Sequence, residues 1–127
     1  MDKTEARIRL AIDAMGSDLG PSEVLEGVAQ AIDRSPWNTE FVLFGQEEII
    51  EPLITSHSIL SRSKVEFVHS PEVVGMEEKP IAGIKGKKKS SMSLALQALK
   101  EGEADALLSC GNTGCLMAGG AIKLRTL

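Results

Sequence analysis

The sequence predicts an α/β fold in which helices cover both faces of a parallel sheet. Short apolar runs rich in β-branched residues alternate along the chain with segments whose apolar residues recur at helical spacing. The 127 residues are 43% hydrophobic and 25% charged, which is typical of a globular domain with its own core. Strands that alternate with helices usually become parallel neighbours, because each helix carries the chain back to the edge where it started.

The first two predicted elements are a strand and a helix. Residues 7–14 form an apolar run followed by a glycine-rich loop, which indicates a buried strand. A helix is predicted from Pro21 to about Arg34, because proline suits the first helical position. Its apolar stripe consists of Val24, Leu25, Val28, Ala29 and Ile32.

Two strands with a short helix between them are predicted next. The strands are expected at Glu40–Gly45 and Lys64–Ser70, which are short runs rich in valine and phenylalanine. The helix is expected at Gln46–Thr55, with acidic residues in its first turn. Pro52 lies inside this helix and is expected to break or kink it, because proline has no backbone N–H to donate.

A long loop and a well-marked helix are predicted after the third strand. The loop is expected at Pro71–Lys89, which is rich in glycine and lysine, and loops of this length usually have a function. The helix begins at Ser90 or Ser91, either of which is a suitable N-cap, and stops at Gly102. Its expected buried stripe consists of Leu94, Ala95, Ala98 and Leu99.

A fourth strand at residues 104–110 and a last helix at Gly114–Leu127 complete the pattern. Gly119 and Gly120 are expected to seat a neighbouring helix or a second subunit. The sequence stops within this helical pattern, so we expect residues 1–127 to be a fragment of a longer protein.

Composition excludes several classes of function. Aromatic residues make up 3% of the chain, which argues against a protein that stacks nucleic-acid bases, and the net charge of −4 argues against general polyanion binding. No apolar run is long enough to cross a membrane, and the N-terminus has no signal-peptide core. His57 and His69 have no ligand spacing to Cys110 and Cys115, so we expect no metal site and interpret both cysteines as reduced structural thiols.

The first candidate site is the turn SCGNTG, at the end of the fourth predicted strand. Gly111 and Gly114 let the backbone reverse so that several N–H groups point the same way. The helix that follows adds partial positive charge, and Asn112 and Thr113 add side-chain donors. This pattern favours an anion site with phosphate as the usual guest, and a tight turn without a ligand fits it equally well.

The second candidate site is the lysine-rich segment that leads into the well-marked helix. Lys88 and Lys89 directly precede the hydroxyl groups of Ser90 and Ser91 at a helix N-terminus. The glycine spacing of a P-loop is absent, so an NTPase is excluded. The segment fits phosphate or an acidic protein partner, and a solvated basic loop with an ordinary N-cap is the alternative.

The third candidate site is the loop after the first strand, which carries Asp13, Gly16 and Asp18. Two carboxylates there can order a hydrogen-bond network or act as a base, and turn capping is the alternative. All three candidate sites lie before a helix, and a parallel sheet is expected to gather them on one edge. No nucleophile with a neighbouring base is visible, so an enzyme built on these sites would work by positioning and electrostatics, without a cofactor.

Four stretches of the chain together resemble one protein family. They read IRLAIDAMGSDLGP, VEFVHSPEVVGMEEKP, KKKSSMSLAL and LLSCGNTGCLMAGG. In this order they resemble the bacterial phosphate acyltransferases of phospholipid synthesis, the PlsX family. The resemblance covers the chain from about Ile8 to its last residue.

The resemblance implies a fold, a reaction and partners. The fold is a Rossmann-like α/β/α sandwich with a mainly parallel sheet, similar to isocitrate dehydrogenase and phosphotransacetylase, and here truncated. The reaction converts acyl-[acyl carrier protein] and inorganic phosphate to acyl phosphate and free carrier protein, without a metal or cofactor. Members of the family are cytoplasmic homodimers that touch the membrane peripherally and bind no nucleic acid.

The resemblance also implies roles for the three candidate sites. The turn Gly111–Gly114 and the segment Lys88–Ser91 would bind phosphate or the developing acyl phosphate, and the lysine-rich loop would meet the acidic carrier protein. Asp13, Gly16 and Asp18 would shape the same edge. Four further residues match the family pattern without an assigned role, namely His69, Glu72, Met76 and Pro80.

The chain also departs from the family pattern. Ser17, Leu19 and Gly20 replace a glycine, a histidine and an alanine of the first loop, so a possible proton carrier is missing. Cys110 and Cys115 stand where the family has alanine, which supports their structural interpretation. The family is more than twice as long, so the resemblance implies that residues 1–127 are the N-terminal part of a single phosphate acyltransferase domain. Its C-terminal half is absent, and the catalytic residues of that half are unknown here.

Two other functions stay open at this point. One is a related phosphotransacylase that uses acyl-coenzyme A as the donor. The other is an inactive truncated fragment, or the phosphate-binding half of a split enzyme.

Overall fold

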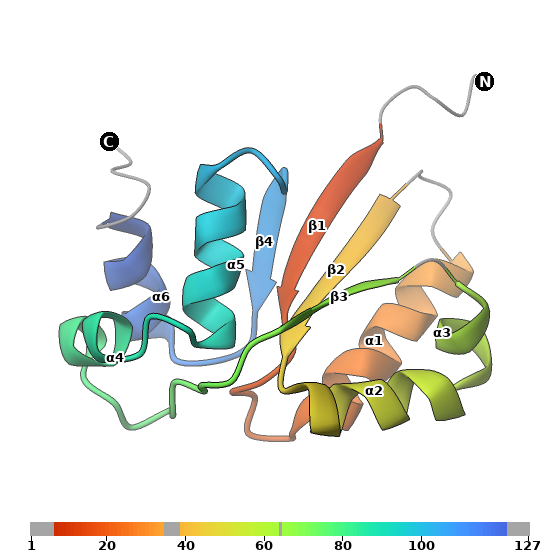
Figure 1. The fold of residues 1–127 in the computed structure, drawn as a ribbon, viewed down its shortest axis with the longest axis horizontal. Helices are drawn as coiled ribbons and strands as arrows, with labels where there is room; N and C mark the ends of the chain where they lie inside the picture. Colours follow the sequence, from red (N-terminus) through yellow and green to blue (C-terminus); the bar gives the residue numbers. More distant parts are fainter. Residues whose placement is uncertain (1–6, 35–38, 64, 122–127) are drawn as a thin grey trace.

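The computed structural model describes residues 7–34, 39–63 and 65–121, and a four-stranded sheet lies at its centre (Figure 1). The strands are β1 (Ile8–Asp13), β2 (Thr39–Gly45), β3 (Glu66–His69) and β4 (Ala106–Ser109). They lie in the order β3-β2-β1-β4, and every neighbouring pair is parallel. The predicted α/β class with a parallel sheet is therefore confirmed, and the arrangement is Rossmann-like.

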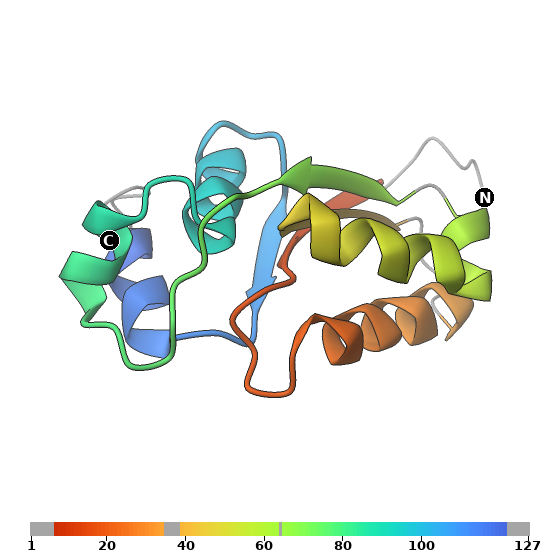
Figure 2. The ribbon, with the colours of Figure 1, turned by 60° about the horizontal axis from the view of Figure 1, so that its bottom comes forward.

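Helices flank the sheet on both faces. They are α1 (Pro21–Arg34), α2 (Glu47–Ser56), α3 (Ser58–Arg62), α4 (Pro80–Gly86), α5 (Ser91–Lys100) and α6 (Thr113–Gly119). In Figure 2, α1 and α2 lie on one side of the sheet and α5 lies on the other. Helices α4 and α6 pack against each other beside α5, at the end of the molecule away from α1 (Figure 1).

The strand residues alternate between two apolar cores, as a sheet buried on both faces requires. Ile12 of β1 and Leu43 of β2 pack with Leu25 and Val28 of α1 and with Ile50 of α2. Residues of the same strands with the opposite orientation face α5, and this second core consists of Ala11, Val42, Phe44, Ala95, Ala98 and Ala104. The buried residues of α1 confirm the core of its predicted stripe.

A third core joins α4, α5 and α6. Met92 and Leu96 of α5 pack there with Ile84 of α4 and Cys115 of α6. A Cβ atom on Gly119 would lie 2.6 Å from the Leu96 side chain, so glycine at this position allows α6 to approach α5 closely. The expectation that these glycines seat a neighbouring helix is confirmed for Gly119, whereas a Cβ atom on Gly120 would have no neighbour within 4 Å.

The structure corrects the expected loop at Pro71–Lys89, because α4 lies within it. Pro80 is the first residue of α4, a position that suits proline because its missing N–H would have no partner there. Helix α4 has only seven residues, Pro80–Gly86, which are too few to show a helical repeat of apolar residues in the sequence.

Pro52 does not interrupt α2, so the expected break is also wrong. The N–H that proline lacks would have paired with the carbonyl of Glu48, four residues earlier. Both residues are exposed, so water can satisfy that carbonyl. A second short helix, α3, follows after His57 and was not predicted.

The buried face of α5 differs from its predicted stripe. Leu94 and Leu99 are only partly buried, whereas Met92 and Leu96 are fully buried. The reason is that α5 contacts both the sheet and the α4–α6 pair, so its apolar face is wider than a single stripe.

The remaining boundaries agree with the sequence to within two residues where the structure describes them. Helix α6 begins at Thr113, one residue before the expected start. Residues 122–127 of the expected last helix and Lys64 of the expected third strand lie outside the described residues. Within the described ranges, no helix is long and apolar enough to cross a membrane.

Candidate functional site

The predicted loops do meet at one edge of the sheet, the carboxyl edge, where all four parallel strands end (Figure 1). Asp13 ends β1, Ser109 ends β4, and the two residues are paired in the sheet register. The loop after β1, the first turn of α5 and the turn after β4 are in mutual contact there. The expected convergence of the three candidate sites is confirmed.

Asp13 is the centre of this edge, and its side chain is almost completely buried, with 3% exposed. Its carboxylate accepts hydrogen bonds from Ser91 Oγ at 2.5 Å, Ser109 Oγ at 2.8 Å and Met15 N at 3.1 Å. Burial raises the pKa of Asp13 above its usual value, and the three hydrogen bonds oppose that rise. The carboxylate therefore ties three segments that are far apart in the sequence.

Two glycines lie directly over this carboxylate. Gly16 has a φ angle of +84°, which favours glycine, and a Cβ atom there would lie 3.5 Å from Gly111 Cα and from Val74 O. A Cβ atom on Gly111 would lie 3.4 Å from Asp13 Oδ2. Gly111 N donates a hydrogen bond to Ser109 Oγ at 3.1 Å. The positive φ angle therefore accounts for the glycine at position 16, and the two backbone segments lie close enough that an added Cβ atom would be in van der Waals contact with the opposite segment.

Asn112 has a structural role in this arrangement. Its Oδ1 atom caps α6 by accepting a hydrogen bond from Cys115 N at 3.0 Å. Its Nδ2 atom shares its two hydrogens among three carbonyl oxygens of the segment after β3, those of Gly75, Met76 and Glu78, at 3.0, 3.1 and 2.8 Å. Asn112 therefore joins the segment that follows β3 to the turn that follows β4, although β3 and β4 are the two outer strands of the sheet.

The remaining residues of that turn lie against α4. A Cβ atom on Gly114 would lie 2.9 Å from the ring of Pro80, so a small residue is needed where α6 begins. Thr113 is the first residue of α6, and its side chain lies outside the described part of the structure.

The hydroxyl groups at the start of α5 are buried and engaged. Ser90 Oγ caps the helix by accepting a hydrogen bond from Ser93 N at 3.0 Å. Ser91 Oγ donates to Asp13, and Ser91 N donates to Glu72 O at 3.1 Å. Ser90 and Ser91 are at most 1% exposed. Both serines therefore hold this end of α5 in place.

The two candidate lysines, by contrast, face solvent. Lys88 and Lys89 are exposed at the turn before α5, and the backbone N–H of Lys89 donates to Glu72 Oε1 at 2.9 Å. Asp18 is also exposed, in the loop after β1. These three side chains lie beside the carboxyl edge and take no part in the hydrogen bonds that hold it together.

Three residues have contacts at this edge that sequence reasoning did not assign, although two of them, Ser109 and Lys87, lie within the candidate segments. Ser109 could have been found because it ends the strand next to Asp13, so their side chains emerge on the same face. Lys87 and Glu78 form an ion pair at 2.6 Å, and Lys87 Nζ also donates to Val73 O at 2.7 Å. The hydrogen bond from Lys87 lowers the pKa of Glu78. No spacing signal indicates that pair, because it depends on how the segment after β3 folds back.

The other residues that match the family pattern have local roles. His69 Nδ1 accepts a hydrogen bond from Glu47 N at 3.1 Å and so caps the start of α2. Glu72 pairs with Lys89 and Ser91 as described, and Met76 is 47% exposed. Cys115 is buried and burial raises the pKa of its thiol, whereas Cys110 is exposed. Among the described residues, no three His, Cys, Asp or Glu side chains gather as a metal site.

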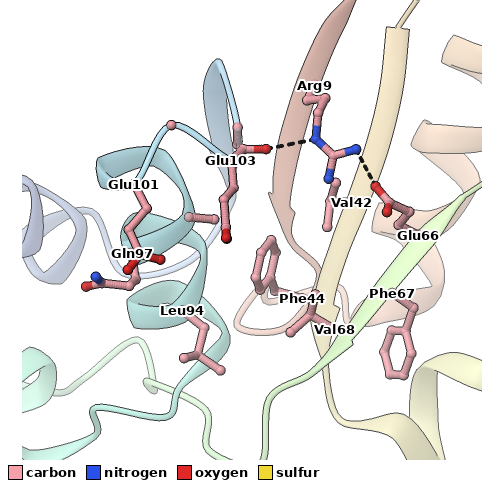
Figure 3. Close-up of a pocket in the computed structure, with 13 residues that line it drawn as sticks. Arg9, Val42, Phe44, Glu66, Phe67, Val68, Leu94, Gln97, Glu101 and Glu103 are labelled. Atoms are coloured by element: carbon pink, nitrogen blue, oxygen red, sulfur yellow. Dashed lines mark hydrogen bonds and ion pairs between the residues drawn. The ribbon is translucent and has the colours of Figure 1, made fainter.

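A second feature, the groove, lies on the α5 face of the sheet over β2 and β3 (Figure 3). Its cavity has a volume of about 600 Å³, and its apolar walls include Val42, Phe44, Val68, Leu94 and Ala98. Arg9 lies at its rim, where the guanidinium contacts Glu40 and Glu66 and donates to the carbonyl oxygen of Glu103. None of the predicted site residues lines the groove.

Comparisons with known proteins agree on one family. The family model described as "Fatty acid synthesis protein" matches residues 8–127. A phosphate acyltransferase of Azorhizobium caulinodans is 47% identical over 123 residues, which are 96% of this chain and 34% of that protein. Phosphate acyltransferases of Aeromonas salmonicida and Levilactobacillus brevis are 42% and 40% identical, over 93% and 91% of this chain and 34% and 32% of those proteins. The chain thus spans about a third of the length of the curated relatives that it matches.

Proposed function

Because the chain belongs to the fatty acid synthesis protein family, we propose that it provides part of an acyltransferase that forms acyl phosphate. The donor is acyl-[acyl carrier protein] and the acceptor is inorganic phosphate. A phosphate oxygen attacks the thioester carbonyl carbon, the new C–O bond forms, and the C–S bond breaks. The carrier thiol leaves with the proton that the attacking phosphate gives up. No cofactor is needed for this exchange.

One observation supports this proposal above the others, the contact between Gly16 and Gly111 at the carboxyl edge. Ligands of parallel α/β sheets bind at the ends of the strands, where backbone can come close to an anion. Neither glycine carries a side chain that would keep an anion away from the backbone at this contact. The turn Gly111–Gly114 and the start of α6 are the part of this edge that we propose to contact phosphate.

The candidate residues divide into two groups under this proposal. Lys88 and Lys89 are exposed cations beside the edge and are proposed to attract phosphate electrostatically. Four other residues make their hydrogen bonds within the protein and are proposed to hold the edge in shape, namely Asp13, Ser90, Ser91 and Asn112. Gly16 and the exposed Asp18 belong to the loop that closes it.

The proposed protein partner is the acidic acyl carrier protein. Four exposed lysines lie at the N-cap of α4, on α4 and on the turn after it, in a chain whose net charge is −4, namely Lys79, Lys85, Lys88 and Lys89. A local basic surface on an acidic protein favours approach of an acidic partner from that side. Homodimer formation, a cytoplasmic location and peripheral contact with the membrane stay predictions.

The proposal is tested by measuring acyl phosphate, trapped with hydroxylamine, from acyl carrier protein and phosphate. The 127-residue chain is assayed alone and mixed with the separately expressed remaining two-thirds of the Azorhizobium caulinodans relative. We expect activity in the mixture, and a loss of at least about fivefold in Lys88→Ala/Lys89→Ala. Lys100→Ala, which removes an exposed lysine at the other end of α5, is the matched control.

Other outcomes separate the alternatives. A mixture that accepts only acyl-coenzyme A identifies the related phosphotransacylase. Folded chains that form no acyl phosphate with either donor, alone or mixed, contradict the proposed activity. Phosphate binding by the chain without activity in any mixture would favour the phosphate-binding fragment, which the one-third length of the match makes the second candidate.

A further inference from the structure

The contacts of Asp13 indicate how its carboxylate serves the carboxyl edge. Its oxygens accept from three donors that belong to three different segments, Met15 N in the loop after β1, Ser91 Oγ in α5 and Ser109 Oγ at the end of β4. The side chain is 3% exposed, so solvent does not compete for these bonds. A single buried group therefore sets the relative position of three segments.

The two serine hydroxyls give their only hydrogen atoms to this carboxylate. Each hydroxyl has one donor and two lone pairs, so towards an anion Ser91 and Ser109 offer no hydrogen bond. The carboxylate itself is an acceptor when ionised and repels a phosphate. Asp13, Ser91 and Ser109 are therefore unsuited to direct contact with phosphate, although they lie directly beneath the glycine turn.

One of these hydroxyls extends the constraint to the backbone. Ser109 Oγ donates to Asp13 Oδ2 at 2.8 Å and accepts from Gly111 N at 3.1 Å. Gly111 in turn lies against Gly16, where an added Cβ atom would be 3.5 Å from Gly111 Cα. The positions of both glycines thus depend on the bond between Asp13 and Ser109.

We infer that Asp13 is a positioning residue of the phosphate site, which acts through Ser109 on the backbone of Gly111 and does not touch phosphate. This inference rests on the proposed function, because it takes the turn Gly111–Gly114 as part of the phosphate site. It changes the role that the sequence indicated for Asp13 from binding to orientation.

Asp13→Asn separates orientation from charge, because the two effects have opposite signs. Loss of the negative charge beneath the site favours phosphate, so a purely electrostatic role predicts tighter binding in the variant. An amide group has one acceptor oxygen in place of two, so either Ser109 Oγ or both Met15 N and Ser91 Oγ lose their acceptor, and the turn loses its fixed position. Orientation therefore predicts weaker binding, by roughly tenfold.

Ser109→Ala tests the same link with the carboxylate left in place. The variant keeps the bonds from Ser91 and Met15 to Asp13. It loses the bond from Ser109 Oγ to Asp13 and the bond from Gly111 N to Ser109 Oγ, so we expect phosphate affinity to fall roughly tenfold. Ser93→Ala is the matched control. Ser93 is a buried serine near the start of α5, and its Oγ has no hydrogen-bond partner among the described residues.

The experiment is a titration of the 127-residue chain with inorganic phosphate, followed by NMR of the backbone amides. We expect the Gly111 amide resonance to shift with phosphate in the wild type, and to start from a different position in Ser109→Ala. The phosphate Kd rises in Asp13→Asn and Ser109→Ala and stays unchanged in Ser93→Ala. A merely structural role would lower the melting temperature while the folded chain kept its Kd.

The outcomes distinguish the inference from the function on which it rests. A wild-type chain that does not bind phosphate at millimolar concentrations contradicts the proposed site, and the inference with it. If the wild type binds phosphate, two results overturn the inference and leave the proposed function standing. One is a phosphate Kd of Ser109→Ala equal to that of Ser93→Ala, and the other is a lower phosphate Kd in Asp13→Asn than in the wild type. If Asp13→Asn does not fold, Ser109→Ala decides the question.

Discussion

The carboxyl edge and the groove arrange their polar groups in opposite ways. At the edge, Asp13 and Asn112 are buried, and each makes several short hydrogen bonds to segments distant in the sequence. At the groove, the walls are apolar and the charges lie at the rim, where Arg9 and Glu66 are 34% and 56% exposed. Buried polar groups require their partners, because an unmet donor or acceptor is costly away from water.

This difference indicates which part of the molecule holds its side chains most firmly in place. Breaking an exposed ion pair lowers the free energy of unfolding only slightly, because water replaces either partner. The edge, in contrast, keeps its shape only if each donor keeps its acceptor. The proposed site therefore lies where the structure is most tightly specified, and the following predictions measure the contrast.

The largest effect is expected for Asn112→Ala. The variant loses the N-cap of α6 and leaves three carbonyl oxygens without their donor, so the free energy of unfolding should fall by about 3 kcal/mol. Urea denaturation followed by circular dichroism measures the change. Gln30→Ala, at an exposed position on α1, serves as the control. A loss below about 1 kcal/mol would show that these bonds do not fasten the segment after β3.

A smaller effect on stability is expected from the titration of Asp13, and the direction in which stability changes with pH tests it. Its pKa in the folded chain is raised above the usual 3.8 by burial, so the folded state binds this proton more readily than the unfolded state. The favourable contribution is complete below the unfolded pKa and is lost as pH rises through the folded pKa. Wild type should therefore lose stability relative to Asp13→Asn as pH rises from about 3 to about 7.

Glu78 provides the opposite case within the same edge. Its pKa is lowered by the hydrogen bond from Lys87, so its contribution is present above the usual 4.5 and is lost as pH falls. Urea unfolding of wild type, Asp13→Asn and Glu78→Gln across this pH range separates the two. A wild type that gains on Asp13→Asn as pH rises would contradict the assigned role of burial.

The smallest effect is expected for Arg9→Gln at the rim of the groove. The guanidinium contacts Glu40 and Glu66, but these pairs are partly exposed, so unfolding should become easier by less than about 1 kcal/mol. Added salt should reduce even this difference, because it screens exposed charges. Denaturation at low and high salt provides the measurement. If the free energy of unfolding fell by more than about 2 kcal/mol at both salt concentrations, the rim of the groove would be fixed as strongly as the carboxyl edge, and the contrast would be wrong.

The sequence alone determined the order of the elements and the class of the fold. Apolar runs and helical stripes depend on residues close together in the chain, so β1, α1, β2 and β4 were predicted nearly to their ends. It also determined that the candidate loops would meet, because parallel strands place their carboxyl ends on one edge. Periodicity failed for α4, where seven residues are too few, and for Pro52, where solvent exposure compensates for the lost bond.

The tertiary structure alone decided what each polar residue at the edge does. Asp13 and Asn112 look like potential ligands in the sequence, because each accepts only one hydrogen bond from a near neighbour, from Met15 N and Cys115 N respectively. Their other partners lie 78 and 96 residues away for Asp13, and 34 to 37 residues away for Asn112. Only folding brings these groups together, and once paired in a buried site they support the edge, whereas Lys88 and Lys89 stay exposed to solvent.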